Sequence, residues 1–159
     1  MSEIYTFDDF LATVEDKDQE FVRGVHKELT ALGCRADVKA AKSGYVVSYL
    51  ANKKTAANYV FRKKGLIMRI YANHIAEYMD ILDTFPDTMT ETIQKAPVCK
   101  RLLNPADCNQ RCQMGYDFIM KGERFQKCRN GAFLFLLTEE SKPFVEALVL
   151  REVQEAVKP

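Results

Sequence analysis

The chain has no tryptophan, only two histidines and no long apolar run among its 159 residues. The longest uninterrupted apolar stretch, 132–137, is far shorter than the roughly 20 residues that a membrane-spanning helix needs. The segment 1–9 is acidic and lacks the basic and then apolar layout of a secretory signal peptide. These absences predict a protein that neither spans a membrane nor is secreted, and we expect it in the cytoplasm.

The sequence also lacks the short motifs that mark common enzymes. It contains no GxxxxGK[ST] phosphate loop, no GxGxxG and no HExxH. His26 lies beside the apolar stripe of a predicted helix, and His74 follows a predicted helix cap, where we expect it at the surface. Nothing here argues for catalysis, so we expect a protein that is not an enzyme, although an enzyme that uses dispersed residues stays open.

Charge is nearly balanced in total, at +1, but it is segregated along the chain. Segment 1–20 is strongly acidic, 38–76 contains lysines and arginines but no acid, and 99–130 is again rich in bases. One interpretation is a pair of solvated sheets that neighbouring acidic helices neutralise. The other is a basic face for an anion or a nucleic acid.

Hydrophobic periodicity predicts an α+β fold with largely antiparallel sheets and flanking helices. Apolar residues at helical spacing indicate helices, and β-branched or aromatic alternation between turn residues indicates strands and hairpins. The helices are expected at 18–32, from 73 to about 82, at 87–96, from Asn104 onward and at 142–157, with Glu152 on the outer face of the last. The strands are expected from Val38, at 44–50, in hairpins at 58–71 and 115–128, and at 132–137, the last buried on both faces.

We expect 1–159 to form a single compact domain, which bears signs of an internal duplication. Segments 18–84 and 87–157 both read helix, strands, helix, and Gly44-Tyr45 and Gly115-Tyr116 open their sheets at matching places. If the halves are related, the seam between them is a natural ligand cleft.

Four cysteines cluster in segment 99–128, and the rest of the chain holds only Cys34. Their spacing is C-x8-C-x3-C-x15-C, and the x3 pair places two sulfurs on one side of a helical turn. Four thiolates suit tetrahedral zinc, and a complete set of four ligands indicates a structural site. The predicted zinc ligands are Cys99, Cys108, Cys112 and Cys128.

Other interpretations of these cysteines stay open. Zinc ribbons usually carry C-x2-C pairs, which this segment lacks. Reduced cysteines are often simply buried, and an iron–sulfur cluster or disulfides are further alternatives. Nearby bases, Arg129 among them, would offset the charge of thiolates.

A ligand-binding surface is predicted from strand parity. In the hairpin at 58–71, one side is apolar enough for the core and the other carries arginine and tyrosine. Guanidinium groups beside aromatic rings suit a planar or anionic ligand, or single-stranded bases. The candidate ligand-binding residues are Tyr45, Arg62, Arg69, Tyr71 and Tyr116.

Three functions follow as hypotheses. The first is a cytosolic, non-enzymatic domain that binds or senses a small molecule and contains a structural zinc site, with an aromatic pocket near Tyr45 and Tyr116 and tightly packed Phe133 and Phe135. The second is a nucleic-acid-associated accessory protein that uses a basic face at 53–69. The third is an interaction module that docks this same face on an acidic partner.

Overall fold

The computed structural model describes residues 5–42, 44–104, 106, 115–129 and 131–158. It contains a five-stranded antiparallel sheet, a separate two-stranded hairpin and helices, and the predicted α+β class with largely antiparallel sheets is confirmed. Within these ranges, no helix combines the length and apolar character needed to cross a membrane.

Two helices precede the sheet. The short α1 (Phe7–Leu11) was not predicted; it is capped by Thr6, whose Oγ1 accepts a hydrogen bond from the Asp9 amide while the Asp9 carboxylate accepts one from the Thr6 amide. The predicted helix at 18–32 is α2 (Asp16–Ala31), which buries one side. It ends where Gly33 takes a φ of +102°, a conformation that glycine adopts at low cost.

The main sheet has the strand order β1-β2-β3-β4-β7. Its strands are β1 (Arg35–Ala41), β2 (Gly44–Ala51), β3 (Lys54–Arg62), β4 (Gly65–Ile70) and β7 (Leu134–Leu136). Asn52 and Lys53, with φ of 50° and 69°, make the two-residue turn between β2 and β3. Positive φ at both positions matches the right-handed twist of the flanking strands.

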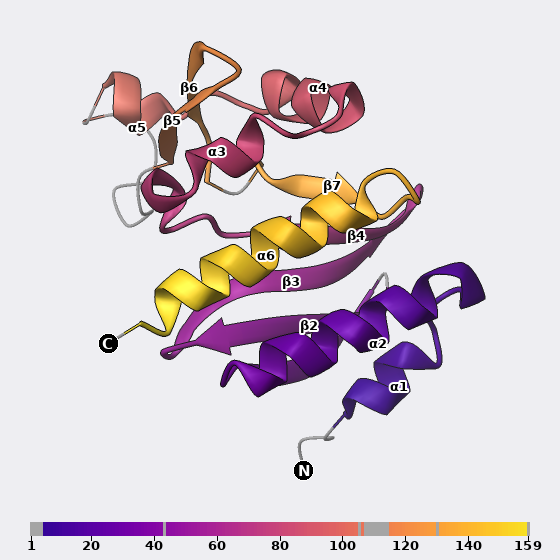
Figure 1. Cartoon of the computed structure of the whole chain (residues 1–159). Helices are drawn as coiled ribbons and strands as arrows, with labels where there is room; N and C mark the ends of the chain where they lie inside the picture. Colours follow the sequence, from indigo (N-terminus) through magenta and orange to yellow (C-terminus); the bar gives the residue numbers. More distant parts are fainter. Residues whose placement is uncertain (1–4, 43, 105, 107–114, 130, 159) are drawn as a thin grey trace.

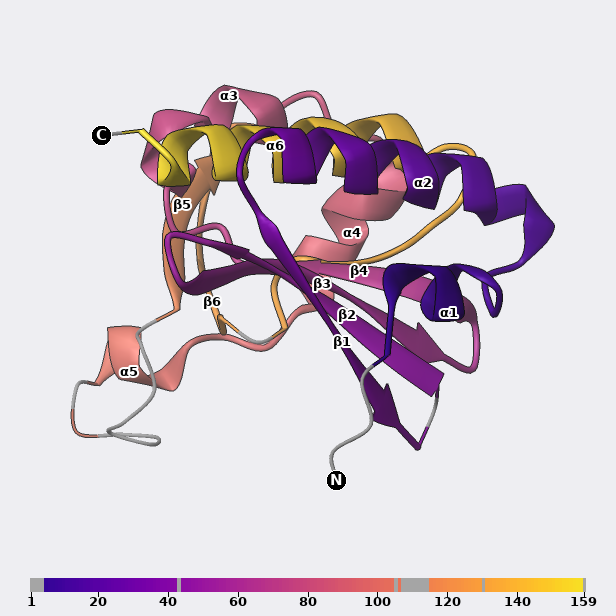
Figure 2. The same cartoon turned by 90° about the horizontal axis from the view of Figure 1, so that it is seen from below.

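Helices α2 and α6 (Lys142–Ala156) lie side by side on one face of this sheet (Figures 1 and 2). The cross-strand row Val47, Tyr59, Met68 and Phe135 is buried beneath them. The next row, Ser48, Asn58, Arg69 and Leu134, points to the opposite face because neighbouring residues of a strand alternate sides. The predicted parity of the 58–71 hairpin is therefore confirmed.

Helix α6 is buried more widely than its sequence pattern indicates. Glu152, predicted on the outer face, is 0% exposed. The helix packs on β3 and β4, and Glu152 also reaches His74 and Tyr78 in the segment that follows β4. The prediction was wrong because it considered one buried stripe, whereas this helix has neighbours on two sides.

The segment between β4 and β7 forms a second group of elements beyond β4 and β7 (Figure 1). The helix predicted from residue 73 is divided into η1 (Ile75–Glu77) and α3 (Met79–Leu82). The remaining elements are α4 (Asp87–Lys95), α5 (Lys100–Leu103) and the hairpin of β5 (Tyr116–Met120) and β6 (Glu123–Lys127). The helix predicted from Asn104 falls mostly outside the described residues.

The two halves do not each form their own complete sheet. Strand β7, expected with the second half, pairs with β4 through Met68 and Phe135 and leaves β5 and β6 as a separate hairpin. Phe133 and Phe135 are tightly packed, as expected, at 1% and 2% exposure, whereas Leu134 and Leu136 are only half-buried at this edge strand. One cluster of buried side chains runs from α1 to α6. The duplication and its boundaries stay predictions.

Candidate functional site

The structure divides the five candidate ligand-binding residues into two groups. Tyr45 lies on the helix-covered side of β2, its ring centroid 5.2 Å from that of Tyr5, and exposed Arg62 ends β3 near the same end of the sheet. Arg69 and Tyr71 share the uncovered side toward the other end. Tyr116 in β5 lies with Tyr71 at that end, since both rings contact the same arginine. Tyr45 and Tyr116 therefore belong to different groups, and the predicted aromatic pocket near both stays a prediction.

The group that joins Tyr71 to Tyr116 is Arg129. Its Cζ lies 5.3 Å from the Tyr71 ring centroid and 5.7 Å from that of Tyr116. A guanidinium within about 6 Å of an aromatic face is attracted by the ring quadrupole. Two rings therefore restrain one cationic head group, a role that the sequence analysis did not assign to Arg129.

Tyr116 is a rigid support for this cation. Its ring is 4% exposed and lies 5.1 Å from that of Phe133, and its Oη accepts a hydrogen bond from the Ala72 amide at 3.0 Å. Burial raises the pKa of Tyr116, although Arg129 and the Ala72 N–H partly oppose the rise. The phenol stays neutral, so it leaves the charge of Arg129 uncompensated.

Arg129 faces a surface hollow of about 300 Å³ lined by Lys54, Thr55 and Tyr71. Within the described part of the chain, neither Lys54 nor Arg129 makes an ion pair with a carboxylate. Two cations at one hollow without acidic partners attract anions. This hollow, with its support of Tyr71 and Tyr116, is the candidate site.

A second hollow, of about 350 Å³, shares Lys54 and Thr55 with the first. His74 lines it, and its Nδ1 lies 2.7 Å from Oε2 of the buried Glu152. His74 lies at the surface, as predicted, with 40% of its side chain exposed, and it also holds a buried carboxylate, a contact that the sequence did not predict. No local sequence signal links residues 78 positions apart.

Of the four predicted zinc ligands, Cys108 and Cys112 lie outside the described residues. Cys99 and Cys128 flank an antiparallel bridge between Val98 and Lys127: the Cys99 amide donates to the Gln126 carbonyl and the Cys128 amide to the Pro97 carbonyl. This register places Cys99 and Cys128 diagonally on one side of the ladder, because neighbouring residues of a strand alternate sides.

The Cys99 sulfur has a hydrogen-bond donor. The Gly115 amide lies 3.2 Å from Cys99 Sγ, the kind of contact that stabilises a thiolate or a metal-bound sulfur. Gly115 fits there because it has no side chain: a Cβ would lie 2.1 Å from the Lys127 carbonyl oxygen. Among the described residues, no three His, Cys, Asp or Glu side chains form a metal-ligand group, and the four-cysteine site stays a prediction.

The thiols and the candidate site are continuous along the chain. Gly115, which contacts Cys99, directly precedes Tyr116, and Cys128 directly precedes Arg129. Buried Lys127 does not face the thiols as a free charge, because its Nζ donates to the Gln94 and Ala96 carbonyls at the end of α4. The position of the Arg129 stack therefore depends on the backbone around the cysteines.

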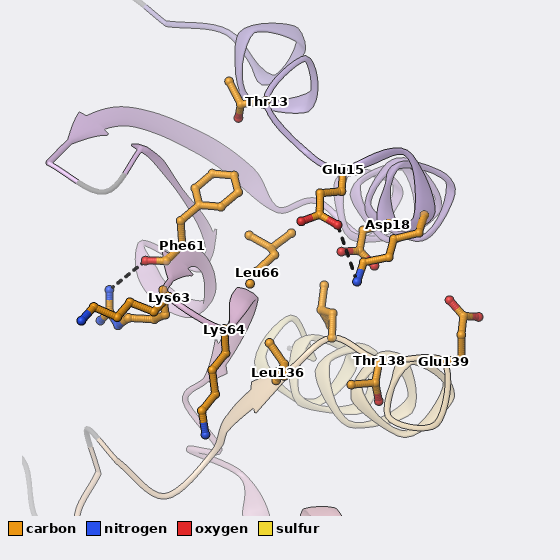
Figure 3. A pocket seen from close by; sticks show the side chains of 14 residues that line it. Thr13, Glu15, Asp18, Phe61, Lys63, Lys64, Leu66, Leu136, Thr138 and Glu139 are labelled. Carbon is orange, nitrogen blue, oxygen red and sulfur yellow. Dashed lines mark hydrogen bonds and ion pairs between the residues drawn. The ribbon is translucent and has the colours of Figure 1, made fainter.

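The bases at 53–69 are spread along the sheet rather than gathered at one place, with Arg69 between the two ends of β3. Lys53 and Lys54 lie at one end of β3, and Arg62 begins a second group of bases at the other, about 25–30 Å away at 3.3 Å per residue. Around the hollow of about 430 Å³ at that second end, Lys63 and Lys64 lie on one side and Glu15, Asp18 and Glu139 on the other (Figure 3). Lys17, which also lines this hollow, pairs with Glu15. This mixture of charges gives the nucleic-acid hypothesis less support than the anion hypothesis.

Cys34 and His26 lie apart from the candidate site. Cys34 is buried after α2, and burial raises the pKa of its thiol. The His26 ring stacks on the Phe7 ring, with 3.6 Å between the ring centroids, and His26 Nδ1 lies 2.9 Å from the Tyr49 hydroxyl. Burial lowers the pKa of His26, with Asp8 opposing the change.

Comparison with protein families, with curated proteins and with solved structures finds no match to this chain.

Proposed function

We propose that the protein is a non-enzymatic, cytosolic binding domain for a small planar anion, held at the hollow of Lys54, Thr55, Tyr71 and Arg129. The observation that carries the proposal is the Arg129 guanidinium, restrained by two tyrosine rings and without a carboxylate partner among the described residues. A cation that is already ordered loses little conformational entropy when it binds, so more of the interaction energy appears as affinity.

The site suits a ligand that combines negative charge with a flat apolar part. A carboxylate or phosphate can accept hydrogen bonds from Arg129, and the positive charge of Lys54 attracts it. Charge-assisted hydrogen bonds of this kind are stronger than those between neutral groups. The partly exposed Tyr71 ring offers an aromatic surface beside them. Arg69 lies on the same side of the sheet and adds to the positive potential.

A titration with benzoate tests this proposal. Replacing Arg129 with glutamine is expected to weaken binding about 10- to 100-fold, because a hydrogen bond to a charged group contributes about 1.5–3 kcal/mol. Backbone amide shifts of Tyr71 and Arg129 report the site by NMR. Arg124→Gln is the matched control, since Arg124 pairs with Asp117 on the exposed hairpin. Equal affinity of Arg129→Gln and the parent protein would contradict the proposal.

We further propose that Cys99, Cys108, Cys112 and Cys128 bind one structural zinc ion. The shared side of Cys99 and Cys128 and the Gly115 N–H···S contact support the first and last ligands, and the sequence alone supports the middle two. Bound zinc would hold the backbone on both sides of the Arg129 stack.

Metal analysis of protein purified without a histidine tag tests the zinc proposal. About one zinc per chain is expected, and Cys99→Ser and Cys128→Ser should lose it while Cys34→Ser retains it. Absence of metal together with five titratable thiols would overturn the proposal. Visible absorbance with bound iron would instead indicate an iron–sulfur cluster.

A further inference from the structure

Glu152 is a fully buried carboxylate that the anion site does not use. At 0% exposure it accepts three hydrogen bonds: from the His74 amide at 2.8 Å, from the Tyr78 hydroxyl at 2.5 Å and from His74 Nδ1 at 2.7 Å. A buried carboxylate is tolerated only with such compensation. The arrangement fixes the His74 ring, with its Nδ1 donating to Glu152.

This orientation decides what His74 offers to a ligand. Because Nδ1 is used by Glu152, Nε2 is the nitrogen left to bind anything else. The ring lines the hollow of about 350 Å³, together with Lys54, Asn52 and Asn73. An anion at Nε2 receives a hydrogen bond only from the doubly protonated ring, which donates from both nitrogens.

The charged groups around His74 favour an anion in that hollow. Glu152, which also lines the hollow, approaches from α6 and accepts from three donors, and Lys54 approaches from β3 without an ion-pair partner in the described structure. Tyr78 contributes a neutral hydroxyl that is used on Glu152, and burial and Glu152 raise its pKa. The nearest further acid on α6, Glu155, is held by Arg151 and Lys158.

We propose that His74 and Lys54 bind a phosphate group, and that the ligand of this protein is an aromatic phosphate ester which spans both hollows. This inference rests on the proposed anion site, because the two hollows share Lys54 and Thr55. The phosphate lies between the His74 ring and Lys54, and the planar part extends past Thr55 to Tyr71 and stacks on the Arg129 guanidinium. A ligand without a phosphate, such as benzoate, places its carboxylate on Arg129 instead. A tetrahedral phosphate accepts hydrogen bonds from several directions, which fits donors from β3 and from the segment after β4.

The two histidines make the test direct. Imidazole nitrogen shifts of His74 and His26 are followed by NMR across pH 5–9, with and without phenyl phosphate, and a His26→Gln variant assigns the signals. Phenyl phosphate is expected to move the midpoint of the His74 titration upward by about one pH unit, equal to about tenfold tighter binding to the protonated ring. Phenyl phosphate should leave the midpoint of the His26 titration unchanged, because the His26 ring stacks on Phe7 beside α1.

A variant separates binding from a purely structural role of the His74–Glu152 pair. Lys54→Gln, at an exposed position without a role in that pair, should fold normally and abolish most of the phosphate-dependent shift of His74. An unchanged His74 titration with saturating phenyl phosphate, or an equal shift in Lys54→Gln, would overturn the inference.

Three probes distinguish failure of this inference from failure of the proposed function. Phenyl phosphate should bind more tightly than benzoate and inorganic phosphate, because it alone fills both hollows. Benzoate binding that depends on Arg129, with no response of His74 to either phosphate, would keep the planar-anion function and overturn the phosphate site. A His74 response to inorganic phosphate without any Arg129-dependent benzoate binding would support the phosphate group and overturn the planar-anion function.

Discussion

Replacing Glu152 with alanine is expected to lower the free energy of unfolding by about 3–5 kcal/mol. The substitution removes the acceptor for the buried Tyr78 hydroxyl and for the amide and ring of His74. Each buried donor left without a partner costs about 1–3 kcal/mol, and the shortened side chain also leaves a space beside the Tyr78 hydroxyl. Urea unfolding followed by circular dichroism measures the change.

Two further substitutions identify the source of this effect. Glu152→Gln keeps the shape of the side chain and one acceptor oxygen, so it should lower the free energy of unfolding by less than Glu152→Ala does. Glu139→Ala removes an acid with 86% side-chain exposure and should change stability by less than about 1 kcal/mol. A loss of less than about 1 kcal/mol for Glu152→Ala would mean that α6 does not depend on this carboxylate.

Stability is also expected to fall steeply above about pH 10. Burial raises the pKa of Tyr49, Tyr59, Tyr78 and Tyr116 in the folded protein, with neighbouring charges adding to the rise for the first three. Below the unfolded pKa of about 10 both states keep the phenolic protons, and the free energy of unfolding is unaffected. Above it the unfolded chain loses protons that the folded chain retains, so stability decreases.

The four tyrosines act together in this transition. Each contributes about 1.4 kcal/mol per pH unit once the unfolded phenol is ionised, which gives roughly 5–6 kcal/mol per unit for all four. Urea midpoints at increasing pH, with tyrosinate absorbance on the same samples, measure the effect. The absorbance of the buried tyrosines should appear only as the protein unfolds. Their titration near pH 10 in a folded protein would show that these rings reach water.

Much of the local structure followed from the sequence. The apolar spacing of Val22, Val25 and Leu29 predicted α2, and the alternation around Tyr59 and Met68 predicted both the hairpin and its buried side. These predictions succeeded because a strand's two faces and a helix's buried stripe are set by residues within a few positions. Helix α1 was missed because only five residues form it and its cap depends on two local hydrogen bonds.

The candidate site shows where this reasoning reached its limit. Tyr71 and Tyr116 were both selected, but the cation between them was not identified, because Arg129 meets their rings only after β5–β6 folds beside the end of β4. Tyr45 and Arg62 were grouped with them by type and by nearness in sequence. The sheet places Tyr45 on its helix-covered side, and Tyr45 and Arg62 lie near the same end of the sheet, away from Tyr71.

By itself the sequence determined the α+β class, the hairpins and the buried side of the first hairpin, because these follow from the periodicity of apolar residues. Strand pairing of β7 with β4, burial of Glu152 beneath His74, and the stacking of Arg129 were decided by the tertiary structure alone. The physical reason is that periodicity records which side of an element is apolar, whereas it does not record which distant element covers that side. Hydrogen bonds and cation–π contacts between residues far apart in the chain form only when packing brings them together.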